Sequence, residues 1–147
     1  MGIGSVYRNF PSRSDLIAGV FRREVDACAA EATTLSDTHP PGEALSLWLN
    51  RYTQFIATKK GLASALHSGD PAFATLPDYF RESFEPALTA LLDRAAQAGD
   101  IGGGVAPYDL LRAIGNLSVA SGPDGASHTR RMVDLLIQGL RFQGPRP

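Results

Sequence analysis

The sequence lacks several features that would restrict its class. It has a single cysteine, Cys28, so no disulfide can form within the chain. It opens without the charged and then apolar run of a secretory signal peptide. No stretch approaches the roughly 18 consecutive apolar residues of a membrane span. These absences predict a cytoplasmic protein with no membrane anchor.

An excess of charge of one sign is also missing. The 14 Lys and Arg residues nearly balance 15 Asp and Glu residues, which leaves a formal net charge of -1. No strong overall field therefore draws the chain toward nucleic acid, and any DNA contact must come from a local patch. With 147 residues, of which 44% are hydrophobic, the chain can bury the core of one globular domain.

The residues of common catalytic and cofactor sites are scattered or absent. His39, His67 and His128 lie far apart, and neither an HExxH zinc motif nor a GxSxG nucleophile elbow occurs. Residues 2–4 lack the third glycine of a dinucleotide-binding loop, and residues 102–104 lack the lysine of a phosphate loop. The sequence therefore predicts no enzyme, no metal site and no cofactor.

Apolar residues recur at spacings of three and four through most of the chain, and no convincing alternating run indicates a strand. The predicted class is all-α. A proline-containing stretch at residues 36–42 should separate the first two helices, and Pro86 should kink or restart a later one. We expect helices at residues 14–33, from 43 to about 60, and at 61–67, 77–98, 107–120 and 127–142.

The most specific signal is the segment GIGSVYRNFPSRSDL at residues 2–16. It contains a glycine turn, a Ser followed by an apolar residue and Tyr, two polar or basic residues, and then Phe-Pro before a capped helix. This order closely resembles the recognition helix of TetR-family repressors and the start of the helix that follows it. Residues 131–141 also resemble the closing helix of that family. The resemblance implies a TetR-like helical bundle with a C-terminal ligand-binding and dimerisation domain.

The chemistry of the segment agrees with DNA contact. A short helix with small residues at its start can enter the major groove closely, and a tyrosine hydroxyl or an arginine can reach phosphate oxygens. Phe10 is more simply explained as a core residue. The resemblance places Ser5 and Asn9 nearest bases or phosphates, Tyr7 on a phosphate and Arg13 on the backbone. The candidate DNA contacts are Ser5, Tyr7, Arg8, Asn9 and Arg13.

The headpiece predicted by the resemblance is incomplete. A helix-turn-helix needs two helices that this sequence does not show before its recognition helix. Met1 is then an internal methionine or the start of a shortened chain, and we expect no specific DNA binding by this chain alone. Residues 1–13 would be the remnant of the helix-turn-helix, 14–35 a connecting helix and 36–147 the ligand-binding and dimerisation domain.

Aromatic side chains concentrate on the central predicted helices, where members of the family enclose an effector. A helical aromatic stripe also suits an ordinary core, and this alternative stays open for each residue singly. Together they exceed what so small a core needs, so we expect a partly apolar cavity with Tyr and His groups. Its candidate lining residues are Trp48, Tyr52, Phe55, His67, Phe73, Tyr79, Phe80 and Phe84.

The last predicted helix is apolar on more than one face, which predicts a partner that covers the rest. Gly115 and Gly139 cost about 1 kcal/mol each relative to Ala, which a close approach of helices would explain. A self-complementary patch suits a twofold homodimer. The candidate interface residues are Gly115, Met132, Val133, Leu136, Ile137, Gly139 and Leu140.

The function implied by the resemblance is a ligand-responsive transcriptional regulator that acts as a repressor. A small-molecule effector would shift the population of two states and weaken the binding of operator DNA by a full-length form. The alternative is a helical small-molecule-binding and dimerisation module with no DNA-binding activity of its own.

Overall fold

The computed structural model describes residues 13–59, 68–118 and 122–142, and within these ranges the chain is helical without a strand. The all-α class is therefore confirmed. The elements are α2 (Arg13–Thr38), α3 (Pro41–Thr58), the short 3-10 turn η1 (Pro71–Phe73), α5 (Leu76–Gln97), α6 (Pro107–Leu117) and α7 (Gly125–Arg141).

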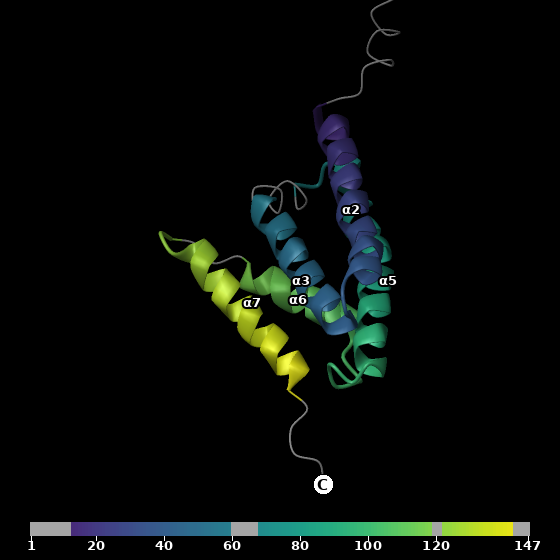
Figure 1. Ribbon diagram of the computed structural model, residues 1–147. Coiled ribbons are helices and arrows are strands. Elements are labelled where there is room, and N and C mark those ends of the chain that lie inside the picture. Colours follow the sequence, from purple (N-terminus) through teal and green to yellow (C-terminus); the bar gives the residue numbers. More distant parts are fainter. Residues whose placement is uncertain (1–12, 60–67, 119–121, 143–147) are drawn as a thin grey trace, which may run out of the picture.

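Helices α2, α3 and α5 pack against one another and contain most of the core (Figure 1). The buried residues of α2 recur at alternating spacings of three and four, so that one face of the helix meets its neighbours. The ion pairs Arg51–Glu31 and Lys59–Glu24 link α3 to α2 at the edge of this layer. The buried stripe of α2 comprises Ala18, Phe21, Val25, Cys28 and Ala32.

Helix α2 ends later than the expected residue 33, at Thr38. No helix-breaking residue occurs between residues 33 and 38, and the Thr38 hydroxyl donates to the carbonyl of Thr34 at 2.8 Å. The residue before a proline is disfavoured in helical conformation, so the helix stops ahead of Pro40. The linker predicted at residues 36–42 was therefore too long.

Helix α3 begins at consecutive prolines, where a missing amide costs nothing because the first-turn donors have no helical partner. Its first turn is capped from far along the chain: the Gly42 amide donates to Oδ2 of Asp100 at 2.9 Å. Trp48 in the middle of α3 is fully buried, and its indole donates to the carbonyl of Cys28 at 2.9 Å. α3 is therefore fixed at its start by the end of α5 and at its centre by α2.

Helix α5 continues through Pro86, where a kink or restart was expected. Proline removes one helical hydrogen bond and leaves the carbonyl four residues earlier without its amide partner. That carbonyl belongs to Glu82, and both Glu82 and Pro86 are exposed, so water can replace the lost bond. The helix therefore tolerates the proline on its solvent side.

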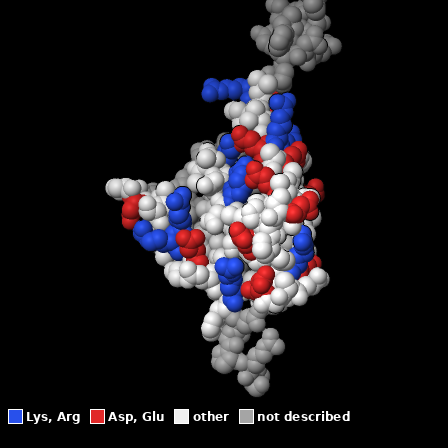
Figure 2. Space-filling view, viewed as in Figure 1, with Lys and Arg blue, Asp and Glu red and all other residues white. Residues whose placement is uncertain are grey.

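Helices α6 and α7 form the other part of the bundle, with α7 leaning away from α2 and α5 (Figure 1). α7 packs on α3 and α6, mainly through Val133 and Ile137. The Ser118 hydroxyl donates to the Ile114 carbonyl at the end of α6. Lys and Arg side chains are mixed with Asp and Glu over the visible face (Figure 2). In the ranges that the structure describes, no helix has the length and apolar character to cross a membrane.

Candidate functional site

Five of the aromatic candidates form one packed cluster. Trp48 and Tyr52 are stacked, with ring centroids 5.5 Å apart. Phe84 from α5 meets both rings edge-on, at 5.9 and 5.2 Å. Phe55 and Phe80 extend the cluster, with Phe55 5.5 Å from Phe84. Such edge and offset contacts between aromatic rings are stabilising beyond the buried area. These side chains fill the space between α3 and α5 rather than surround a closed cavity.

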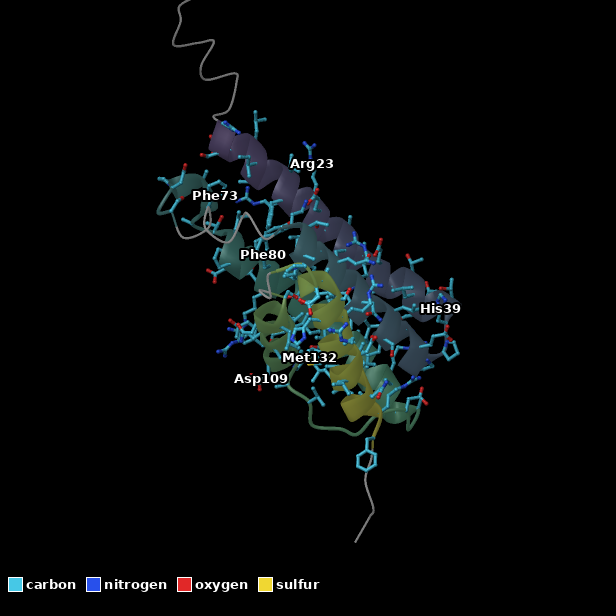
Figure 3. All side chains as sticks on the ribbon, turned by 90° about the vertical axis from the view of Figure 1, so that its left-hand side faces the viewer. Arg23, His39, Phe73, Phe80, Asp109 and Met132 are labelled. Atoms are coloured by element: carbon cyan, nitrogen blue, oxygen red, sulfur yellow. The ribbon has the colours of Figure 1, made fainter. Side chains whose placement is uncertain are left out.

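The other three aromatic candidates lie elsewhere. Phe73 is buried in η1, which packs on α2, and Figure 3 shows it toward the N-terminal end of α2, opposite His39. Tyr79 is half-buried and donates a hydrogen bond to Oδ1 of Asp26 on α2. His67 is outside the described residues.

The cluster borders a cleft of about 470 Å³ between α5 and α6. Tyr52, Phe84 and Leu111 are buried and form its floor. Part of its wall is Gly115, where an added Cβ would meet no atom within 4 Å. The remaining lining residues are Pro77, Phe80, Arg81, Tyr108, Arg112 and Asn116. We call this the α5–α6 cleft.

The charged side chains that line the α5–α6 cleft are two arginines beside one tyrosine. The Arg81 guanidinium carbon lies 3.9 Å from the ring centroid of Tyr108, and that of Arg112 lies 5.5 Å from it. Arg81 also donates from Nε to Oε2 of Glu85 at 2.8 Å, and this bond raises the pKa of Arg81 above its usual value. The rim of the cleft is therefore cationic at neutral pH.

The floor of the α5–α6 cleft offers a neutral phenol. The Tyr52 hydroxyl lies 3.4 Å from the carbonyl oxygen of Leu111, to which it donates. Burial raises the pKa of Tyr52 well above its usual value, so the group stays protonated through the physiological range. The cleft thus combines an apolar aromatic floor with positive charge at its mouth.

A second cleft of about 480 Å³ lies between α3 and α7. The residues that line it are small or polar, and no aromatic side chain is among those described. Most of its hydroxyl and amide groups are already bonded to helix carbonyls, as with Asn50 to Ser46 and Thr129 to Leu117. We call it the α3–α7 cleft. Its two charged lining residues, Arg130 and Asp134, are of opposite sign, whereas those of the α5–α6 cleft are both arginines.

The predicted ligand-binding residues include Tyr52, Phe80 and Phe84 of this cleft. They do not include the residues of its rim, Arg81, Tyr108 and Arg112. Tyr108 and Arg112 are four residues apart in a helix, so they lie on one face and could have been paired. Arg81 comes from a different helix, and no sequence pattern indicates that it lies over Tyr108. That contact depends on how α5 and α6 cross.

The candidate DNA contacts lie at or beyond the start of the described chain. Arg13 is the first residue of α2 and is exposed. Ser5, Tyr7, Arg8 and Asn9 fall outside the described residues. Within residues 13–59, 68–118 and 122–142, no three His, Cys, Asp or Glu side chains are grouped so that they could hold a metal ion.

The candidate interface residues differ in their burial within one chain. Val133 and Ile137 are buried against the rest of the same chain. Two large apolar side chains that were not among the candidates are exposed here: Leu135 on α7 at 59%, and Phe142, directly after the helix, at 74%. The other candidates are Gly115, Met132, Leu136 and Leu140, which are half-buried, and Gly139, which is exposed.

Comparison with known proteins agrees with this helical arrangement. Residues 40–142 match the family described as transcriptional regulator SbtR-like, C-terminal domain. A crystal structure of a TetR transcriptional regulator from Streptomyces coelicolor is 34% identical, with a TM-score of 0.77. The alignment covers 98% of this chain and 83% of that one. No curated protein sequence matches the chain.

The family match spans most of the chain, and the structural match extends through α2 and the other described helices. Both point to the same class of protein, one of transcriptional regulators rather than of enzymes. The resemblance in residues 2–16 and 131–141 points there independently. The chain belongs to the TetR family of transcriptional regulators.

Proposed function

We propose that this chain is the effector-binding and dimerisation body of a ligand-responsive repressor, and that the effector binds in the α5–α6 cleft. The observation that carries the proposal is that three rings of the aromatic cluster, Tyr52, Phe80 and Phe84, line this cleft. A concave site with an apolar floor and a few polar groups is the usual form of a small-molecule site.

The wall of the cleft is joined to α2, which leads back to the segment that resembles a recognition helix. Phe80 in the cleft lies 5.0 Å from Phe21 of α2, ring to ring. Two more contacts join the same elements. Arg22 of α2 donates to the Thr75 hydroxyl at 2.9 Å, and the Tyr79 hydroxyl donates to the carboxylate of Asp26 on α2. A ligand that displaces Phe80 would therefore move α2, provided that it binds the two arrangements with unequal affinity.

The proposed DNA contacts remain Ser5, Tyr7, Arg8, Asn9 and Arg13. The proposed protein partner is a second copy of the chain, bound through α7. On α7, Met132, Leu135 and Gly139 recur at helical spacing beside the buried stripe, and Phe142 follows directly after the end of the helix. Because this row is more exposed than Val133 and Ile137, we add Leu135 and Phe142 to the proposed twofold interface.

Trp48 provides a direct test of the effector site. It is the single tryptophan, and it stacks on Tyr52 in the floor of the cleft. In a metabolite screen, a ligand in the cleft should change Trp48 emission and raise the melting temperature. Gly115→Leu should block this ligand because its side chain would enter open space in the cleft. Ala57→Leu is the matched control, since Ala57 lines the α3–α7 cleft.

A ligand response that survives Gly115→Leu but is lost in Ala57→Leu would move the site to the α3–α7 cleft. DNA binding is tested with a form of the protein that carries a complete helix-turn-helix, by selection of duplexes from a random library followed by addition of the ligand. Sequence-selective duplexes that the ligand releases support a repressor. A failure to enrich any sequence would support the alternative, a ligand-binding and dimerisation module without DNA-binding activity.

A further inference from the structure

The α5–α6 cleft has a charge pattern that restricts its ligand. We propose that it binds a small organic anion, with an apolar or aromatic body on the floor and a carboxylate held between Arg81 and Arg112. This inference rests on the proposed function, because it assigns a chemical class to the effector of the same cleft.

The first support is the sign of the charged side chains that line the cleft. Both charged side chains that line it are arginines, whereas nearby carboxylates such as Asp78, Glu82 and Asp109 lie outside its lining. Among the described residues, Arg112 forms no ion pair. An arginine beside an apolar cleft with no carboxylate of its own favours an anion supplied by a ligand.

The second support is the way in which Tyr108 holds the guanidinium groups. Arg81 lies over the ring at 3.9 Å and Arg112 approaches it at 5.5 Å. The ring attracts both cations and restricts their side chains, so less freedom is lost when they bind. Glu85 accepts from Nε of Arg81, which leaves the two terminal amino groups of that guanidinium to donate to another acceptor.

The third support is the chemistry of the floor. Tyr52, Phe84 and Leu111 are buried and line the cleft, so its floor is made of large apolar side chains with one phenol group. A bare inorganic anion would leave this surface uncovered, and an organic cation would meet two arginines at the mouth. A volume of about 470 Å³ suits a body of one or two rings or a short branched chain.

A matched set of three probes tests the charge preference: 4-phenylbutyrate, its neutral amide and the corresponding amine. Calorimetric titration of the full chain near neutral pH should show 4-phenylbutyrate binding about tenfold more tightly than the amide, as expected for charge-assisted hydrogen bonds at a partly exposed site. The amine should bind most weakly. Arg112→Gln and Arg81→Gln should each reduce the preference for the carboxylate to within about twofold.

The control is Arg130→Gln, which removes an exposed arginine from the lining of the α3–α7 cleft and should change nothing. Gly115→Leu should abolish binding of all three probes. If it does so while the amide binds as tightly as 4-phenylbutyrate, the anion inference is overturned but the proposed cleft stands. Loss of binding in Arg130→Gln alone would overturn both. Binding of every probe weaker than about 1 mM would overturn the anion inference, while the metabolite screen still decides the proposed site.

Discussion

The layer of α2, α3 and α5 and the pair of α6 and α7 differ in how much apolar surface they cover within one chain. Trp48, Leu45 and Leu49 of α3 are all fully buried between their neighbours. On α7, by contrast, Val133 and Ile137 are covered, while Leu135 and the residue just after the helix, Phe142, are mostly exposed. Leu16 and Val20 near the start of α2 are also exposed, at 57% and 50%, so the contrast is between α3, which is enclosed at its centre, and α7, which leaves apolar side chains uncovered in one chain.

The difference indicates that the two regions have different roles. A layer that is packed on itself transmits displacement between helices, because close-packed side chains cannot absorb it. A helix with an uncovered apolar row is suited to association. The α5–α6 cleft lies between the two regions, so its ligand would contact both.

The largest expected effect is in the layer. Trp48→Ala should lower the free energy of unfolding by about 3 to 5 kcal/mol, because it empties a fully buried site and removes the indole hydrogen bond to the Cys28 carbonyl. Denaturant unfolding followed by circular dichroism measures this loss. Leu47→Ala, at a position of α3 that is 38% exposed, should cost less than about 1 kcal/mol. Equal losses would show that the layer is not tightly packed.

A substitution on α7 should act on association instead. Leu135→Glu should weaken the proposed dimer at least about 100-fold, because it places a charge in an apolar contact, and the helical content should be unchanged. Light scattering over a concentration series measures the shift to monomer. Ala126→Glu adds the same charge at an exposed position on the opposite side of α7 and should have little effect. An unchanged dimer in Leu135→Glu would place the interface elsewhere. Ile137→Glu would be a poorer test, since Ile137 is buried in its own chain.

Alkaline pH should lower the free energy of unfolding through groups buried in the layer. Burial raises the pKa of Cys28 from 9.0 to about 11, so above pH 9 the unfolded chain loses this proton while the folded chain keeps it. Stability from this group is complete below pH 9 and is lost as the pH rises to about 11, with a loss of about 1 kcal/mol near pH 10. Tyr52, whose pKa is also raised, acts in the same direction at higher pH. Urea unfolding at several pH values should show that the free energy of unfolding falls less steeply with pH in Cys28→Ala than in the unchanged chain. An identical pH dependence would contradict the raised pKa of Cys28.

The smallest expected effect is a gain in the second region. Gly115→Ala should stabilise the chain by about 0.5 to 1 kcal/mol, because Ala favours the helix and its Cβ meets no atom within 4 Å. Differential scanning calorimetry would show a small rise in melting temperature. A decrease would indicate that a second copy approaches Gly115 closely, which would place this residue in the dimer contact.

The helical periodicity was enough to predict the class and the order of the helices. α5 and α7 begin and end within about two residues of the expected positions, since proline or glycine marks their limits. The end of α2 could not be predicted from residues 33–38, because threonine, serine and aspartate are compatible with either helix or loop. There the tertiary contacts and the following proline decided the boundary.

The candidate site was predictable in part for a similar reason. Tyr52, Phe80 and Phe84 could be selected because large aromatic residues at helical spacing face inward. Whether they enclose space or fill it depends on packing, and most of them fill it here. Arg81 and Arg112 look like solvent-exposed charges in the sequence. Their position beside Tyr108 follows from the crossing of α5 and α6, which no local pattern specifies.

The bond between Gly42 and Asp100 ties two segments far apart in the chain into one cooperative unit. Asp100 is held at the end of α5 by its own amide, which donates to the Ala95 carbonyl at 2.9 Å. Fraying of this last turn would withdraw the carboxylate from the start of α3, and fraying of α3 would release the carboxylate. In native-state hydrogen exchange, the amide protons of Gly42 and Asp100 should therefore become accessible in the same opening event, with similar protection.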